Sequence, residues 1–238
     1  MEVAMLLRRS GLPVLVIALF TGPVLAGCGA DEPEESAAQL LERAKATLDE
    51  AESAHFVLDS EGAPSSGTLL VGGEGDIARP ASFDGTLEVQ ALGSTLDLEV
   101  VSVDDTVYAQ LPFTSGFSVI DPAQFGFGDP GDLLDPETGI SQLLAEATSA
   151  ELGEESRVDG EVVREVTAEL PGELVEEILS TQSLSEPVQA RFSVAADSGE
   201  LRRAELTGPF FTADADATYT LELSDFGADV EISAPPTG

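Results

Sequence analysis

The sequence predicts an α+β fold in which one large antiparallel β-sheet is accompanied by a few helices. In residues 83–92, apolar side chains such as Leu87 and Val89 alternate with polar ones, a pattern typical of a strand with one buried and one wet face. Similar segments follow one another across short turns such as Asp104-Asp105 and Asp159-Gly160. Short turns favour an antiparallel meander, because parallel strands require long crossover connections.

The predicted elements begin with an amphipathic helix over residues 37–53. Its apolar residues, including Leu40, Ala44 and Leu48, recur at three- and four-residue spacing after Ser36, a residue type common at helix N-caps. A second helix is predicted over 171–179, with Pro171 in its first turn, and residues 120–148 are predicted to form short helices and apolar loops. The predicted strands cover residues 55–59, 67–71, 83–92, 96–100, 106–111, 151–158, 162–170, 188–195, 201–206 and 218–223. Together these elements predict one domain over residues 37–235.

The N-terminus has the order of an export signal. Arg8 and Arg9 precede an apolar run over residues 11–20, which is followed by small residues rather than by a basic stop-transfer segment. The run is shorter than the roughly 20 residues that cross a bilayer, so a transmembrane anchor is the less favoured interpretation. We therefore expect residues 1–27 to be a signal peptide, with Met5 as an alternative start to Met1.

The end of this segment, Leu25-Ala26-Gly27-Cys28, resembles the lipobox of bacterial lipoproteins, and Cys28 is the only cysteine in the chain. The resemblance implies that the Cys28 thiol receives a diacylglyceryl group and that its new amino group is usually acylated. The protein would then be anchored by lipid on the extracytoplasmic face of the cell membrane, with residues 28–36 as the lipidated N-terminus and tether. The alternative is that Cys28 is a small buried apolar residue or a free thiol.

Composition and motifs exclude several function classes. The chain has 45 Asp and Glu against 10 Lys and Arg, so its formal charge of -35 would repel nucleic acid and other copies of itself, and we expect a monomer. There is no nucleophile elbow, phosphate-binding loop or zinc-protease motif, and the single histidine, His55, has no cysteine partner. Acidic pairs in turns are more often solvated than metal-bound. We expect no catalytic residue, metal or cofactor, and an envelope hydrolase is the least favoured function.

Several stretches resemble the LppX/LprG-type lipoprotein family of mycobacteria and related actinobacteria. The most specific is residues 129–140, DPGDLLDPETGI, which fits the pattern D-P-x-x-L-L-x-P-x-T-G-[IL] before an amphipathic helix. Residues 53–58, 85–89 and 107–109 match earlier in the chain, and residues 221–227 match near its end. The resemblance therefore runs from the lipobox to the C-terminus.

The resemblance implies a half-barrel sheet whose concave side, with the helices packed on it, encloses an apolar cavity. Members of the family bind multi-acylated lipids, glycolipids or triacylglycerol and carry them through the cell envelope, some of them with an exporter of the major facilitator class. A sheet with one apolar face suits the binding of alkyl chains, since each methylene removed from water gains about 0.8 kcal/mol. The acidic composition predicts a rim that repels phosphate. The expected cavity lining is Leu87 and Val89, with Leu96, Leu98 and Val100 as weaker candidates, and the expected cavity mouth is Phe117, Phe125 and Phe127.

Two interpretations of the domain remain open. A carrier requires a continuous apolar void of several hundred Å³. A lipid-anchored interaction or assembly scaffold would instead fill its concave face with bulky side chains and expose an apolar patch to a partner. The small residues Gly85 and Ala91, which share a face with Leu87, favour the carrier.

Overall fold

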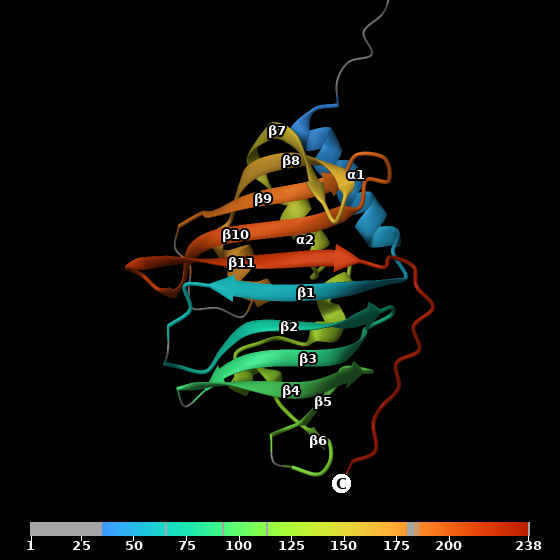
Figure 1. Ribbon diagram of the computed structural model, residues 1–238, viewed down its shortest axis with the longest axis vertical. Helices are drawn as coiled ribbons and strands as arrows, with labels where there is room; N and C mark the ends of the chain where they lie inside the picture. Colours follow the sequence, from blue (N-terminus) through green and yellow to red (C-terminus); the bar gives the residue numbers. More distant parts are fainter. Residues whose placement is uncertain are drawn as a thin grey trace, which may run out of the picture. The chain divides into compact units, whose positions relative to one another are not determined.

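In the computed structural model, eleven strands form a single antiparallel sheet (Figure 1). The structure describes residues 35–64, 66–91, 93–112, 114–179, 184 and 186–237. Glu35–Gly238 is one compact unit. The expected signal peptide, Cys28 and most of the tether lie outside the described residues. The strands are β1 (Ser53–Glu61), β2 (Leu69–Ala78), β3 (Ser82–Ala91), β4 (Ser94–Val103), β5 (Thr106–Gln110), β6 (Ser118–Val119), β7 (Thr148–Val158), β8 (Glu161–Leu170), β9 (Val188–Ala195), β10 (Leu201–Thr212) and β11 (Ala215–Ser224).

The strand order shows that the sheet consists of two meanders joined at its centre. The order is β6-β5-β4-β3-β2-β1-β11-β10-β9-β8-β7, and the first and last long strands, β1 and β11, pair with each other. Every strand predicted from the sequence is present, and the α+β prediction is confirmed. The two-residue edge strand β6 was not predicted.

The chain crosses from one edge of the sheet to the other between β6 and β7, and this crossing places helices over the sheet. It contains the 3₁₀ helices η1 (Pro122–Phe125) and η2 (Pro130–Leu134) and the short α2 (Ser141–Ala145). The segment η2 contacts β2, β3 and β4, whereas α1 (Ala37–Glu50) contacts β7, β9 and β10 and also α2. In Figure 1, α1 and α2 lie behind the sheet, so the helices share one face of it. The last helix, α3 (Gly172–Leu179), follows β8 and contacts α2.

Both ends of α1 have identifiable caps. Ser36 and Gln39 form a capping box, in which the Gln39 amide donates to Ser36 Oγ at 3.3 Å and the Ser36 amide donates to Gln39 Oε1 at 3.0 Å. At the other end, the Arg79 guanidinium donates to the carbonyl oxygens of Ala51 at 2.7 Å and Asp49 at 3.0 Å. Since Arg79 follows β2, these bonds fasten the helix end to the sheet. No helix in the described part of the chain is long and apolar enough to span a membrane.

Candidate ligand-binding pocket

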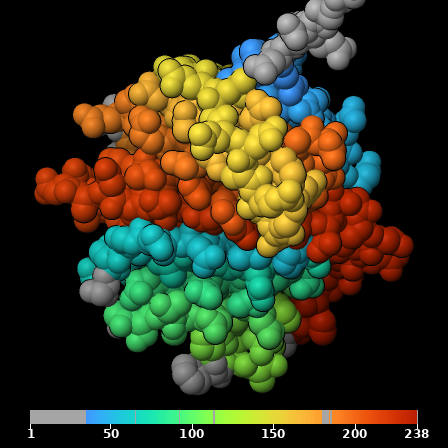
Figure 2. All heavy atoms as spheres, turned by 45° about the horizontal axis from the view of Figure 1, so that its top comes forward, coloured from blue at the N-terminus to red at the C-terminus, as the bar shows by residue number. Residues whose placement is uncertain are grey.

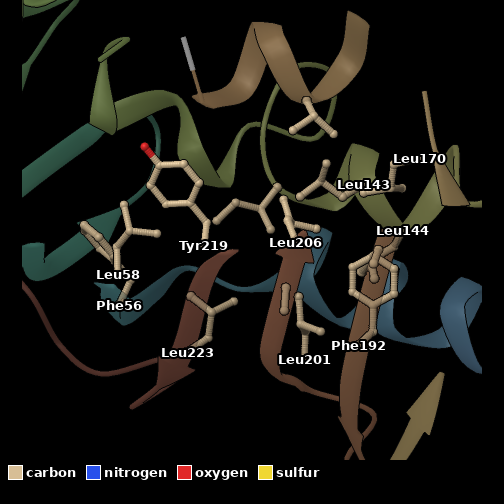
Figure 3. Packing of buried hydrophobic residues seen from close by; sticks show 14 of the residues in the cluster. Phe56, Leu58, Leu143, Leu144, Leu170, Phe192, Leu201, Leu206, Tyr219 and Leu223 are labelled. Carbon is tan, nitrogen blue, oxygen red and sulfur yellow. The ribbon is translucent and has the colours of Figure 1, made fainter. Parts of the chain in front are cut away.

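An apolar pocket of about 80 Å³ lies between the centre of the sheet and the helical layer. Figure 3 shows buried side chains of the sheet, including Leu58, Leu206 and Tyr219, directed toward the helical side of the core, where Leu143 lies. Strands, the crossing segment between β6 and β7, and α3 all contribute to the lining of the pocket. The lining residues are Phe56, Leu58, Leu70, Leu87, Ala204, Leu206, Tyr219 and Leu221 from the strands, Phe127, Gly128, Asp129, Pro130, Leu133, Ile140 and Leu143 from the crossing segment, and Ile178 and Leu179 from α3.

The strand register explains why residues from distant parts of the sequence meet here. Leu58 of β1 lies opposite Leu221 of β11, which in turn lies opposite Ala204 of β10. On its other side, Leu58 lies opposite Gly73 of β2, which lies opposite Leu87 of β3. Cross-strand neighbours of this kind share a face of the sheet. The pocket therefore follows one row of residues across the junction of the two meanders.

Two polar side chains line the pocket, and both have partners. The Tyr219 hydroxyl, on a side chain that is 3% exposed, donates to the Leu70 carbonyl oxygen at 2.6 Å. Burial raises the pKa of Tyr219 above its ordinary value, so the phenol stays neutral. The Asp129 carboxylate accepts the Gly131 amide at 2.9 Å and caps η2. The other residues that line the pocket have apolar side chains or are glycine.

Of the residues expected to line the cavity, the structure places Leu87 in the pocket wall. Val89, Leu98 and Val100 point to the same core and are buried, but they do not line the pocket. Leu96, near the start of β4, is only partly buried. The pocket is centred on β1, β10 and β11; Val89 is two residues beyond Leu87 on β3, and the other three lie on β4, one strand farther toward the β6 edge.

The three phenylalanines expected at the mouth lie in different surroundings. Phe127 lines the pocket and is 3% exposed. Phe125 is partly buried and packs on Phe127, with ring centroids 6.4 Å apart. Phe117 does not line the pocket and instead forms a β-bridge with Thr237 near the C-terminus.

Gly85 does not leave open space as its small size suggested. It lies opposite Gly75, and the Phe83 ring covers both, because a Cβ atom would lie 2.7 Å from Phe83 Cζ at Gly85 and 2.5 Å from Phe83 Cε2 at Gly75. The ring in turn packs on Phe56, with centroids 5.5 Å apart. The two glycines therefore accommodate an aromatic core residue, not a ligand.

The lining residues of β1, β2, β10, β11 and α3, and those of the crossing segment other than Phe127, were not predicted from the sequence. These strands do alternate, and Leu58, Leu206 and Leu221 fall on apolar positions. Their convergence depends on the pairing of β1 with β11, whose partners Leu58 and Leu221 are separated by most of the chain. No local motif encodes that pairing.

The pocket is smaller than the void of several hundred Å³ that was expected. Two polar hollows are larger, at about 370 Å³ each, but carboxylates line them. One hollow lies beneath the β7–β8 turn, which reaches β11 and β1 in Figure 2. Its lining includes the carboxylates of Asp159, Glu161 and Glu222. The other includes Asp59, Glu74, Glu88 and Asp97. Polar groups supply more than half of the lining of each hollow, whereas the lining of the smaller pocket is almost entirely apolar, so the smaller pocket is the candidate site.

All eight cationic side chains of the described residues have partners away from the pocket. Arg79 and Arg157 donate to backbone carbonyl oxygens. The others lie beside carboxylates, as Arg202 does between Glu161 and Glu200 at 2.7 and 2.9 Å. The remaining ion pairs are Arg43–Glu35, Lys45–Asp49, Arg164–Glu155, Arg191–Glu165, Arg191–Glu205 and Arg203–Glu222. No described residue group forms a candidate metal site.

The fold is similar to solved lipoprotein structures. LprF from Mycobacterium bovis superposes with a TM-score of 0.71 at 18% identity, covering 85% of this chain and 97% of that one. LppX from Mycobacterium tuberculosis gives a TM-score of 0.62 at 16% identity, covering 83% and 98%.

Sequence comparison extends this similarity over nearly the whole chain. The lipoarabinomannan carrier protein LprG of M. tuberculosis H37Rv is 26% identical over 230 residues, 94% of each chain. The protein of the same name from Mycobacteroides abscessus is 29% identical over 236 residues, 96% of this chain and 97% of that one. The model of the LppX_LprAFG lipoprotein family matches residues 36–232. This chain therefore belongs to the LppX_LprAFG lipoprotein family.

Proposed function

We propose that this lipoprotein is a non-catalytic carrier that binds multi-acylated lipids, glycolipids or triacylglycerol and moves them through the cell envelope. The observation that carries the proposal is the hydrocarbon-lined pocket between the sheet and a separate helical layer. The relatives named as lipoarabinomannan carriers support the same class of function. Acylated Cys28 attaches the carrier to the extracytoplasmic face of the membrane, and the exporter it works with is of the major facilitator class.

Loading requires the pocket to widen. At about 80 Å³ it is smaller than the roughly 150 Å³ cavity that accepts benzene, and far below the roughly 300–1,000 Å³ of ordinary ligand sites. We place the opening at α3, whose Ile178 and Leu179 side chains form one wall and are partly exposed.

The energies favour such an opening when a lipid is present. Exposing the Ile178 and Leu179 side chains costs at most about 3–6 kcal/mol, because 1.5–3 kcal/mol each applies to fully buried side chains and both are already partly exposed. An acyl chain of about 15 methylenes gains on the order of 12 kcal/mol on leaving water, at about 0.8 kcal/mol each. For an acyl chain that would otherwise be in water, this gain exceeds the cost of opening, so acyl chains could replace the α3 side chains on the sheet.

A second candidate function is a lipid-anchored envelope scaffold without a ligand cavity. Two observations favour the scaffold: the volume of the pocket is small, and the Phe83 ring packs closely against Gly75 and Gly85. A scaffold does not require its core to open, so binding of acyl chains separates the two functions.

The test is transfer of a triacylglycerol with one fluorescent acyl chain from phosphatidylcholine vesicles to the full chain. A carrier takes up the probe, and Leu87→Trp reduces uptake at least tenfold because the indole occupies the pocket. The control Leu152→Trp places the same side chain at a position that is 37% exposed on β7 and leaves uptake unchanged. Absence of uptake by the unmodified chain would favour the scaffold.

A further inference from the structure

The position of α1 defines which edge of the sheet is joined to the N-terminal tether. The helix contacts β7, β9 and β10, and it begins beside β7 at the top of Figure 1; Figure 2 shows the same neighbours. Glu35, just before α1, accepts two hydrogen bonds of 2.9 Å from the Arg43 guanidinium. These bonds, with the charges of Arg43 and of Arg164 on β8, lower the pKa of Glu35. The tether therefore meets the domain at the β7 edge.

The length of the tether limits how far this edge can lie from the membrane. From Cys28 to Glu35 the chain spans at most about 25 Å, at up to about 3.6 Å per residue. The opposite edge, β6, lies ten strand spacings from β7, about 48 Å along the sheet at about 4.8 Å each. An anchor at Cys28 thus keeps the β7 edge near the membrane, but it leaves the sheet free to stand upright or to lie on either face.

The face of the sheet away from the helices, called the outer face below, is unevenly charged. On β1–β4 it presents carboxylates, and these four strands contain no Lys or Arg. Two pairs, Asp76–Asp84 and Glu88–Asp97, lie directly opposite each other on neighbouring strands. On β9 and β10, by contrast, arginines lie beside the glutamates. The outer carboxylates of β1–β4 are Asp59, Glu74, Asp76, Asp84, Glu88, Asp97 and Glu99.

The helical side of the same half of the sheet is also acidic. Residues 111–147, which include the crossing segment, contain six Asp and Glu and no Lys or Arg. Seven of the eight Lys and Arg side chains of the described residues lie on α1 or β7–β10, at the tethered end. At a surface potential of about -30 mV, each carboxylate brought to an anionic lipid surface is disfavoured roughly threefold. Contact of either face of β1–β4 with such a surface is therefore unfavourable.

We propose that the domain stands upright on an anionic membrane, with the β7 edge and the start of α1 toward the lipid surface. The tether holds this edge down, and repulsion of the carboxylates turns the β6 edge and the outer face of β1–β4 away. The proposal rests on the acylation of Cys28 proposed above. It places α3, which joins β8 to β9, on the membrane side of the pocket. Acyl chains then reach the opening at α3 from the surface to which the carrier is anchored.

The experiment uses the absence of tryptophan from the chain, which makes a single introduced indole a unique reporter. Leu152→Trp places the indole on β7 at a residue that is 37% exposed, and Val119→Trp places it on β6 at one that is 62% exposed. Each full chain, purified with its acyl groups, is reconstituted in vesicles of phosphatidylcholine and phosphatidylglycerol that contain a lipid with a dansyl headgroup, which accepts energy from indole. Because the two edges are about 48 Å apart along the sheet, we expect at least about threefold more transfer from Leu152→Trp.

The two variants are matched controls for each other. Both carry the same indole, so its affinity for the membrane interface acts equally on both, and melting temperatures verify that both are folded. Vesicles of phosphatidylcholine alone carry no net charge and do not repel the carboxylates of β1–β4. In these vesicles we expect the ratio of transfer between the two variants to be smaller.

The outcomes separate the orientation from the anchor and the function on which it rests. Equal transfer from the two variants, or more from Val119→Trp, would overturn the orientation while leaving lipid uptake, and hence the carrier function, intact. The same ratio with and without phosphatidylglycerol would also overturn the proposal, because the carboxylates would then have no part in it. Failure of both variants to float with the vesicles would overturn the acyl anchor at Cys28, and the proposal with it.

Discussion

Filling the pocket at Ala204 should stabilise the protein while abolishing lipid binding. Ala204 is 1% exposed, lies on β10 opposite Leu221, and lines the pocket. Cavities destabilise proteins by about 24 cal/mol per Å³, so complete filling of about 80 Å³ raises the free energy of unfolding by at most about 2 kcal/mol. For a chain of this size, that corresponds to a rise in Tm of roughly 4–8 °C. We expect Ala204→Leu to achieve part of this gain.

Ala190→Leu is the matched control, because Ala190 is 5% exposed on the neighbouring strand β9 and does not line the pocket. With no void to receive the larger side chain, we expect it to lower the free energy of unfolding by about 1–3 kcal/mol. Urea unfolding gives both free energies, and vesicle transfer gives probe uptake. If Ala204→Leu destabilised the protein as much as Ala190→Leu, or left uptake intact, the pocket would not be the acyl-chain site.

Three further predictions concern stability. The raised pKa of Tyr219 means that the folded state retains the phenol proton at high pH. Its contribution to the free energy of unfolding is therefore complete below pH 10.0 and is lost as pH rises, by up to about 1.4 kcal/mol per pH unit. In urea unfolding, Tyr219→Phe should remove this dependence on pH, and an unchanged dependence would assign it to another group. Gly85→Ala places a Cβ 2.2 Å from the Glu74 carbonyl oxygen and should lower the free energy of unfolding by more than about 2 kcal/mol. The control Gly153→Ala, on the edge strand β7, should have a much smaller effect. Equal melting temperatures of the two variants would refute the close packing at Gly85. Because the formal charge is -35, Tm should rise between 10 mM and 0.5 M NaCl as repulsion is screened, and a Tm that falls would show that ion pairs outweigh the repulsion.

Local sequence patterns predict most of the secondary structure of this chain. The alternation around Leu87 identified which face of β3 is buried, and the apolar spacing after Ser36 identified α1 and its N-cap. The turns at Asp104-Asp105 and Asp159-Gly160 have positive φ angles, as their residue types suggested. These features depend on neighbours in sequence, so they can be read from it directly.

The pocket depends on contacts that no local pattern specifies. Leu98 and Val100, on the neighbouring strand β4, share the periodicity of Leu87 and were weaker candidates, yet of these three residues only Leu87 lines the pocket. The wall from α3 requires the helix after β8 to lie across the sheet toward β1 and β11. Periodicity gives the face of a strand, but the curvature of the sheet and the pairing of distant strands decide which part of that face remains uncovered.

The central claim is that acyl chains enter the core of this protein, and native mass spectrometry tests it most directly. The full chain is expressed in a mycobacterial host, extracted from the membrane in mild detergent, and measured intact before organic extraction of the bound material. We predict a stoichiometric acylated lipid in addition to the covalent acyl groups proposed at Cys28, and its loss from the Leu87→Trp variant. A mass that accounts for the lipidated chain alone, unchanged after incubation with envelope lipids, would contradict the claim.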